Sequence, residues 1–491
     1  RSRLSRHTSR IRRRRAKQNR AAYIAALKDG ALRRNLVKRT GSRRLFLLVK
    51  AVVLLSDNFS EVGPMTTFDE YCSEMCRLRR AIHRRPEEGW TEFETTWRVF
   101  SFLESLGGFT LKVGQEVVNP EFVLGRDEVK VMKAEERALE HGVSEAFLAR
   151  LGGFTGVVAE MDTGRPGPAV AFRFDMDCVQ VGESQDPEHV PVALGFASER
   201  EGLMHACGHD GHTATGLALA HWVADYRASL CGRIRLIFQP AEEGTRGATA
   251  MAEAGVVDNV NWFFGAHVGC DCAPGEVGII QKGFLATTKI DIAFTGKASH
   301  AGSDPEKGRS ALMAAAACSL MMQGISRHRE GSTRVAVGTL HAGEGRNVTP
   351  VHAVIQAEVR GATGSINDWM TERVRSIVRG VSEAYEVQGK MVKAGEACDM
   401  ISDKEACDLV ADAARAIDGV TVKLLNTEDG SEDCSVLMRR AQKTGAKAAF
   451  FLYGCKHNGH HRSDFDIQDE TTLPVAFSLM TGIVTRLNGK A

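Results

Sequence analysis

The sequence lacks an apolar run long enough to cross a membrane. Its best candidate, between Leu45 and Leu55, spans 11 residues and contains Lys50, whereas a membrane helix needs about 20 apolar residues. The sequence also lacks paired C-x-x-C motifs and the dense cysteine spacing of secreted domains, because its 12 cysteines are scattered over 491 residues. We therefore expect a cytoplasmic protein that does not span a membrane.

Acidic residues are almost absent from the first 50 residues, which contain 18 Lys and Arg but only Asp29. The rest of the chain carries 45 basic and 60 acidic side chains, a formal net charge of −15, so the overall value of +2 hides two unlike parts. An acidic body of this kind argues against nucleic-acid binding by the main domains.

The basic leader, residues 1–64, has three interpretations. Its Arg-rich, Ser-containing and acid-poor composition is typical of an organellar targeting segment and also of an arm that binds nucleic acid. The third interpretation is translated upstream sequence. We favour it because the first methionine is Met65 and periodic, foldable sequence begins at Thr67. The leader is therefore kept out of the fold prediction.

Residues 65–286 have the texture of an α/β domain, and this texture returns over residues 397–491. Two amphipathic helices are expected first, at 68–83 and 92–106, followed by a polar insertion at 115–150. Short apolar strands then alternate with helices, and continuously apolar strands are typical of a parallel sheet that is covered on both faces. The expected strands are 156–159, 169–174, 233–238, 262–266 and 448–453. We predict a mostly parallel, helix-flanked sheet.

Residues 287–396 differ, because their strands alternate between apolar and polar side chains. The expected order is βαββαβ, which makes a compact antiparallel sheet with helices on one face, inserted into the larger domain. The predicted strands are 289–296, 334–340, 353–360 and 387–392, and the predicted helices are 310–325 and 369–385. We call this ferredoxin-like α+β insertion the lid.

The most informative stretch is His205-Ala-Cys-Gly-His-Asp-Gly-His212, which contains three histidines, a cysteine and an aspartate. It precedes an apolar run, Thr213–Trp222, that is typical of a helix. Cys207 and His209 are two residues apart, so one extended turn can direct both at the same point. Thiolate, imidazole and carboxylate are ligands of borderline-soft divalent metals. The alternative is an ordinary capped helix start.

Two pairs of acids follow predicted strands. Asp175 and Asp177 come directly after one strand, and the segment Gln-Pro-Ala-Glu-Glu-Gly (239–244), which contains Glu242 and Glu243, comes directly after another. Sites of open α/β sheets lie at the carboxyl ends of the strands. Of two adjacent carboxylates, one can bind a metal while its neighbour takes a proton from water. Turn and helix-capping aspartates and an exposed acidic pair are the competing explanations.

Histidines also follow strands. His267 ends the strand 262–266, and residues 457–465 contain three more histidines. For any single one of these histidines, a structural role or a place in a solvated loop is more common than a ligand role. Cys270-Asp-Cys272 is a weak metal pair, and the turns 298–302 and 345–350 of the lid suit either a functional or a purely structural role.

These motifs occur in the same order as in a known family. They are Arg-Phe-Asp-Met-Asp (173–177), residues 205–212, Gln-Pro-Ala-Glu-Glu-Gly (239–244), His267, Gly-Lys-Ala-Ser-His-Ala-Gly (296–302), Asn347 and His-His-Arg-Ser-Asp-Phe-Asp (460–466). The chain resembles metal-dependent amidohydrolases of the aminoacylase and glutamate-carboxypeptidase type over roughly residues 68–485. The insertion at 115–150 and residues 430–433 make it look most like the branch that cleaves p-aminobenzoyl-glutamate.

The resemblance implies a dinuclear site with two divalent ions, Mn²⁺ or Zn²⁺. The implied metal ligands are Cys207, His209, Glu243, His267 and His461. Glu242 would be the general base, and His300 of the lid would polarise the scissile carbonyl, from across a subunit interface. Asn347 and Arg360 would hold the substrate carboxylate. His212 and His460 would support the ligands or have a structural role.

The sequence departs from the wider family at two positions. Other branches have a bridging aspartate where Cys207 stands, which leaves the identity of the metal open. They have a liganding histidine where Arg173 stands, so Asp175 and Asp177 are expected to support ligands and not to bind metal.

The expected activity is hydrolysis of an N-acyl amino acid, most specifically p-aminobenzoyl-glutamate. The expected partner is a second copy or a related subunit, with no nucleic acid and no membrane. Three alternatives stay open: an acylase of other specificity, a Cys–His thiol hydrolase that uses Cys207, and an inactive paralogue that serves as a binding subunit.

Overall fold

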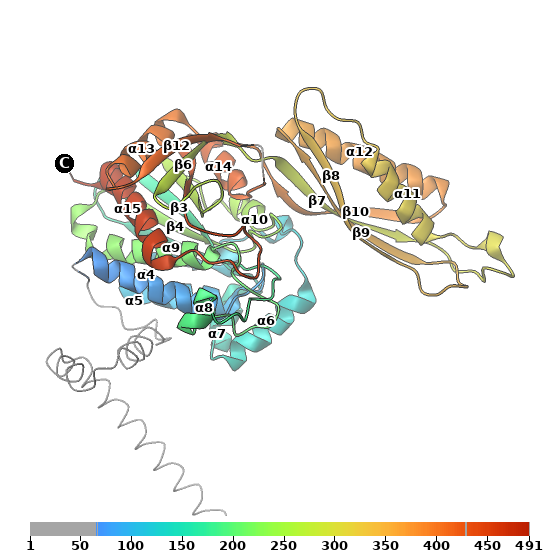
Figure 1. The fold of residues 1–491 in the computed structure, drawn as a ribbon, viewed down its shortest axis with the longest axis horizontal. Coiled ribbons are helices and arrows are strands. Elements are labelled where there is room, and N and C mark those ends of the chain that lie inside the picture. The colour runs from blue at the N-terminus through green and yellow to red at the C-terminus, as the bar shows by residue number, and fades with distance from the viewer. Residues whose placement is uncertain (1–64, 66, 428–429, 491) are drawn as a thin grey trace, which may run out of the picture. The chain divides into compact units, whose positions relative to one another are not determined.

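The computed structural model describes residues 65, 67–427 and 430–490 (Figure 1). The described residues all belong to one compact unit, whose fold is given below. The basic leader and the run Leu45–Leu55 lie outside the described residues. Among the residues that are described, no helix combines the length and the apolar character needed to cross a membrane.

The described chain alternates helices and strands. The α-helices are α4 (Phe68–His83), α5 (Phe93–Leu106), α6 (Glu128–Glu140), α7 (Glu145–Leu151), α8 (Val190–Leu194), α9 (His209–Asp225), α10 (Ala248–Glu253), α11 (Ala311–Gln323), α12 (Gly364–Ala384), α13 (Lys404–Arg415), α14 (Cys434–Lys443) and α15 (Asp469–Asn488). The strands are β1 (Thr110–Val113), β2 (Val157–Asp162), β3 (Ala169–Asp175), β4 (Arg233–Gln239), β5 (Trp262–Val268), β6 (Glu276–Gly283), β7 (Ala286–Thr295), β8 (Thr333–Ala342), β9 (His352–Gly361), β10 (Gln388–Ala397), β11 (Met400–Ile401), β12 (Thr421–Asn426) and β13 (Lys447–Tyr453).

The larger sheet has nine strands in the order β1-β2-β4-β3-β5-β13-β6-β11, with β12 also paired to β6. Its centre, β4-β3-β5-β13, is parallel, and antiparallel pairs extend it on both sides. The expected mostly parallel sheet is therefore confirmed at its centre. Because the four central strands run in one direction, their carboxyl ends share one edge, where sites of open α/β sheets lie.

Helices cover both faces of this sheet, which explains why its central strands are continuously apolar. All seven residues of β3 are buried. Gly216 of α9 lies against Phe174 and Phe238, where a Cβ would come within 2.8 Å of either ring. On the opposite face, Gly265 of β5 leaves room for the sulfur of Cys434 in α14. Close packing on both faces holds the strand ends, and hence the site, in fixed positions.

The lid has the predicted order β7-α11-β8-β9-α12-β10, and its antiparallel sheet is arranged β10-β7-β9-β8 (Figure 1). Its apolar side chains form a cluster separate from the main core, extending from Ile290 to Met391. The last lid strand contacts the larger domain, since the amide of Glu396 donates to the carbonyl of Thr245 at 2.7 Å. The lid therefore adjoins the loop that contains Glu242 and Glu243.

Two local predictions need correction. Helix α9 begins at His209 and not at Thr213, so His209 and His212 lie in its first turn. The segment 115–150 contains two short 3₁₀ turns and the helices α6 and α7, and three residues of α6 are buried (Val131, Ala134 and Ala138). Its apolar side is therefore part of the main core.

Candidate metal centre

Potential ligands from separate segments meet at the carboxyl edge of the central strands. They fall into overlapping groups whose ligand atoms lie within 4.8 Å of one another: Cys207–His209–His267, Cys207–Glu243–His461 and His209–Glu242–Glu243. The structure thus brings together all five side chains predicted to bind metal, with the predicted base beside them.

His209 has one ring nitrogen directed into this cluster with nothing bound to it. Its Nδ1 lies 3.0 Å from the carbonyl oxygen of Asp177, and because a carbonyl only accepts, Nδ1 carries the proton. The buried Nε2 has no hydrogen-bond partner among the described residues. A buried ring nitrogen without a hydrogen-bond partner, on a ring that a hydrogen bond from the other nitrogen holds in place, is the usual arrangement of a metal-binding histidine.

His267 has the same arrangement. Its Nδ1 donates to the carbonyl of Val268 at 2.8 Å, which leaves the Nε2 lone pair directed at the sulfur of Cys207, 3.5 Å away. His461 completes the cluster, with its Nε2 3.1 Å from a carboxylate oxygen of Glu243. The five predicted ligands then offer a carboxylate, three imidazole nitrogens and one sulfur, which fits Zn²⁺ or Mn²⁺ better than Mg²⁺ or Ca²⁺.

The electrostatics of the cluster also fit a cation. Burial would lower the pKa of His209, but the carboxylates of Asp175 and Asp177 outweigh it and raise that pKa to about 10. Burial, followed by the charges of Glu432 and Glu243, raises the pKa of Glu242 well above its ordinary value. Negative charge therefore exceeds positive charge around these ligand atoms, and a divalent ion would balance it.

The loop between β4 and α10 is held by buried carboxylates. Glu92 accepts the amide of Ala241 at 2.7 Å. Asp177 accepts the amides of the next two residues, Glu242 and Glu243, at 3.0 and 2.9 Å. Ala241 has a left-handed backbone, φ 53°, which costs on the order of 1 kcal/mol in a residue other than glycine. Backbone hydrogen bonds to these carboxyl oxygens offset that cost and fix where the two glutamates point.

Further along this loop, Asp433 accepts the amides of Gly247 and Ala248 at 3.2 and 3.0 Å. Glu432 and Asp433 also form ion pairs with Arg173, whose guanidinium is fully buried and also pairs with Asp175. Arg173 therefore neutralises carboxylates beneath the cluster, in agreement with the expected departure from a liganding histidine at this position.

Asp175 and His212 form a further support. Nδ1 of His212 donates to Asp175, and its Nε2 accepts the amide of Val268 at 3.0 Å. Both ring nitrogens of His212 are occupied, which agrees with the structural role expected for it. Asp210 is also directed elsewhere, because Arg79 and His83 each donate to it at 2.7 Å. Of the stretch 205–212, only Cys207 and His209 contribute to the cluster.

Sequence reasoning missed Glu92, and used residues 430–433 only as part of the resemblance to one branch of the family. Glu92 is one of several acids near the start of α5, where acids are common for reasons of helix stability. Nothing in its neighbourhood along the chain indicates a partner 149 residues away. Cys270 and Cys272 do not lie at one site. Cys270 lies near His267, whereas Cys272 is buried in the main core.

The predicted lid residues lie at opposite ends of the lid sheet. His300 follows β7 and is exposed, and its Nδ1 accepts the amides of Gly302 and Ser303 at 3.1 and 3.0 Å. The proton must then be on Nε2, which can donate. Asn347 lies beside it, since its carbonyl accepts the amide of Ala301. Arg360 pairs across the sheet with Thr287 near the start of β7, about 26 Å along β9 from the end nearest His300.

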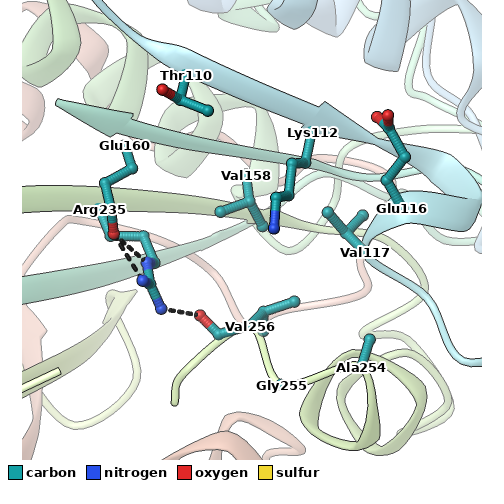
Figure 2. Close-up of a pocket in the computed structure, with 10 residues that line it drawn as sticks. All are labelled: Thr110, Lys112, Glu116, Val117, Val158, Glu160, Arg235, Ala254, Gly255 and Val256. Carbon is teal, nitrogen blue, oxygen red and sulfur yellow. Dashed lines mark hydrogen bonds and ion pairs between the residues drawn. The ribbon is translucent and has the colours of Figure 1, made fainter. Parts of the chain in front are cut away.

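A cavity of about 110 Å³ lies elsewhere, between β1, β2 and the turn after α10. Among the described residues, its lining includes none of the predicted site residues. Figure 2 shows that its arginine, Arg235, is already paired with Glu160 and donates to the carbonyl of Val256. Arg235 and Glu160 satisfy each other, and the predicted ligands and base lie elsewhere, so we do not place the chemistry in this cavity.

Comparison with known proteins places this geometry in context. Residues 171–486 match the peptidase family M20/M25/M40. The chain is 42% identical over 419 residues to a Haemophilus influenzae homolog of a p-aminobenzoyl-glutamate hydrolase subunit, covering 84% of this chain and 98% of that protein. It is also 42% identical over 420 residues to the indole-3-acetyl-aspartic acid hydrolase of Enterobacter agglomerans, covering 84% and 95%.

A solved structure is also similar to this chain. The aminobenzoyl-glutamate utilization protein from Klebsiella pneumoniae is 38% identical, with a TM-score of 0.73, covering 86% of this chain and 98% of that chain. This similarity extends over the larger domain and the lid together.

Proposed function

The chain belongs to the peptidase family M20/M25/M40 and is a hydrolase of amide bonds, and we propose that its substrate is p-aminobenzoyl-glutamate, which it cleaves to p-aminobenzoate and glutamate. The observation that carries this proposal is the convergence of Cys207, His209, Glu243, His267 and His461 around Glu242. The identity of the substrate is supported by the Haemophilus influenzae relative, whose name contains that substrate.

We propose that the five converging side chains hold two divalent ions, Mn²⁺ or Zn²⁺. Bound ions would lower the pKa of a water molecule toward about 7 and polarise the carbonyl of the amide. The protein's own part is to fix the donors: His209 and His267 each have Nδ1 tied to a backbone carbonyl. Nε2 of His209 has no hydrogen-bond partner among the described residues, and Nε2 of His267 faces the sulfur of Cys207.

Glu242 is the proposed general base and acid. Its carboxylate oxygen lies 3.9 Å from Nε2 of His209, inside the ligand cluster, and its raised pKa favours the uptake of a proton. It would take the proton of the attacking water and then deliver it to the leaving nitrogen of the amide. The contacts of Asp177 with the adjoining amides hold Glu242 in the required position.

His300 is proposed to donate from Nε2 to the oxyanion that develops on the scissile carbonyl. It follows the far end of β7, a ten-residue strand that spans about 33 Å from the connection to the larger domain. Both His300 and Asn347 lie at this distal end of the lid. We propose that they act in the site of a second subunit, where a distal lid end can approach the cluster.

The lid offers a surface for that second subunit. Strand β8 is an edge strand of the lid sheet, and helix α11, which packs against β8, exposes three large apolar side chains (Met313, Leu320 and Met321). Unpaired strand edges and exposed apolar helix faces are typical of interfaces between copies. We propose a homodimer, or a heterodimer with a related subunit, that forms here.

Arg360 and Asn347 are proposed to bind the carboxylates of the substrate. In one chain they are too far apart to share a single carboxylate, as shown by their places at opposite ends of β9. Asn347 would come from the partner subunit. Arg360 would come from the chain that holds the metal site, at the end of its lid nearest the larger domain. The two side chains can then contact different parts of one substrate. A bidentate contact of Arg360 with Glu358 would have to be exchanged for the substrate.

A second substrate should be tested equally because the Enterobacter agglomerans relative is as similar and is named for an N-acyl aspartate. Both named substrates release an acidic amino acid. The experiment is an assay of the purified protein on p-aminobenzoyl-glutamate, indole-3-acetyl-aspartate and an N-acyl neutral amino acid, with metal analysis, alone and with a candidate partner subunit. We expect kcat/KM to be highest for p-aminobenzoyl-glutamate. Equal activity on the neutral substrate would contradict the proposed specificity.

A further inference from the structure

We infer that His460 donates a hydrogen bond from Nδ1 to the sulfur of Cys207 and thereby tunes the thiolate as a metal ligand. This inference rests on the proposed metal site but concerns a residue outside its ligand set. It makes His460 a positioning residue that acts through Cys207.

The direction of the hydrogen bond follows from two contacts of the His460 ring. The amide of Cys270 points at Nε2, 3.2 Å away. A backbone N–H can only donate, so Nε2 must be the unprotonated nitrogen and accept. The proton of the neutral ring is then on Nδ1, which lies 3.6 Å from the sulfur of Cys207. This distance is within the range of hydrogen bonds to sulfur, whose atomic radius is larger than that of oxygen.

The backbone around Cys270 is shaped to make this contact. Cys270 has a left-handed conformation, φ 53°, and it follows β5, the strand that contains His267. The turn directs its amide at His460 and away from the sheet. The ring of His460 is also packed between those of His457 and Phe465, at 4.7 and 5.1 Å between ring centroids. The ring therefore has a fixed orientation without any contribution from a metal.

The sulfur of Cys207 belongs to a buried side chain. The other close contact of this sulfur is Nε2 of His267, which carries a lone pair and no proton and therefore cannot donate. Among the described residues, His460 is the side chain placed to offer a proton to this sulfur. A hydrogen bond to a thiolate withdraws charge from it, which favours the ionised form and lowers its donation to a metal.

The test uses Co²⁺ as the probe, because thiolate-to-cobalt charge transfer gives an absorption band in the near ultraviolet. Three variants of the full chain separate the roles of the two ring nitrogens. His460→Asn keeps an N–H group near the position of Nδ1. His460→Gln keeps an acceptor for the amide of Cys270 but has no donor near the sulfur. His460→Leu has neither group.

The expected result is a band at the wild-type wavelength for the Asn variant and a shift to longer wavelength for Gln and Leu, because a thiolate without its hydrogen bond is more easily oxidised by the metal. We also expect the affinity for Co²⁺ to be about 10- to 100-fold weaker in Gln and Leu, the usual effect of removing a group that supports a metal ligand. If the Leu variant fails to fold, the difference between Gln and Asn still decides the matter.

Controls separate this inference from the proposed function. Cys207→Ser should abolish the band, which assigns it to that sulfur, and Lys456→Ala, which removes an exposed side chain of the same loop, should leave it unchanged. A wild-type protein with no thiolate band would overturn the metal site itself. A wild-type band that is identical in the Gln and Leu variants would overturn the role of His460 and leave the metal site standing.

Discussion

The carboxylate of Glu92 accepts the backbone amide of Ala241 at 2.7 Å, although the two residues are 149 positions apart. Its second oxygen accepts the hydroxyl of Thr155 at 2.7 Å. Through Ala241, the start of α5 is tied to the loop that contains the proposed base, one residue further on. The cluster is therefore shaped by a residue that does not belong to it.

Replacement of this carboxylate should affect turnover and not binding. For Glu92→Ala we expect kcat to fall about 10- to 100-fold with little change in KM, because small displacements of a catalytic group have effects of this size. Glu92→Gln should recover most of the loss. Its amide oxygen can still accept from Ala241 and its NH₂ group can donate to Thr155. Steady-state kinetics with metal analysis measures the loss in Glu92→Ala and the recovery in Glu92→Gln.

The Gln variant is a close replacement because burial, followed by the charge of Asp177, raises the pKa of Glu92 well above its ordinary value. Glu88→Gln is the matched control, since Glu88 lies in the same segment but pairs with Lys130 and Gln180. If Glu92→Ala kept the wild-type kcat, the loop would be held by its other contacts.

Loss of the proposed base should leave the metal in place. We expect Glu242→Ala to bind the same amount of metal as the wild type and to lose at least about 100-fold in turnover, the usual scale of general-base catalysis. Metal analysis and kcat on the best substrate are the measurements, with Glu253→Ala of α10 as a surface control. A near-normal turnover would remove Glu242 from the mechanism.

Removal of metal should cost both activity and stability. A ligand that binds only the folded state stabilises it by about 2.7 kcal/mol when its free concentration is 100 times Kd. We therefore expect a chelator to abolish activity and to lower Tm, with both restored by Mn²⁺ or Zn²⁺. His209→Ala should show no such response in Tm. Activity that survives chelation but is lost on alkylation would favour the thiol hydrolase that uses Cys207.

The proposed contribution of His300 to a partner's site can be tested by mixing inactive copies. Glu242→Ala and His300→Ala are each expected to be inactive alone. In a mixed dimer, the lid of the first can complete the site of the second. Random exchange makes half of the dimers mixed, each with one intact site of two, so about a quarter of wild-type activity should return. No recovery, with exchange confirmed by differently tagged copies, would place His300 in its own chain's site.

Much of this site could be predicted from the sequence, because each proposed ligand follows a recognisable apolar strand or opens an apolar helix. The carboxyl ends of parallel strands share an edge, so residues as distant as Glu243 and His461 could be placed together from the pattern of strands alone. The exact start of α9 could not be predicted from the sequence. Its first turn is buried through His209 and His212, polar side chains that interrupt the apolar periodicity by which helices are found.

The supports of the site were the least predictable part. Glu92 and Asp433 act on backbone amides of a loop far away in sequence, and a backbone amide has no residue-specific signal. The distance between Asn347 and Arg360 also depends on strand length and pairing register, so motif order alone assigned both to one carboxylate. The sheet pairing shows that they lie at opposite ends of β9.

The last prediction concerns His83, which is buried between Asp210 and Glu183 at 2.7 and 2.9 Å. Burial would lower its pKa, but the hydrogen bond and charge of Asp210, then Glu183, raise it to about 9. A pKa above the unfolded value of about 6.5 means that protonated His83 stabilises the fold. This contribution, on the order of 3 kcal/mol, is complete below about pH 6.5 and is lost as the pH rises toward 9. Urea unfolding midpoints of the wild type and His83→Gln, measured from pH 6 to 9.5, should therefore converge as the pH rises, whereas a constant difference between them would show that His83 is neutral throughout.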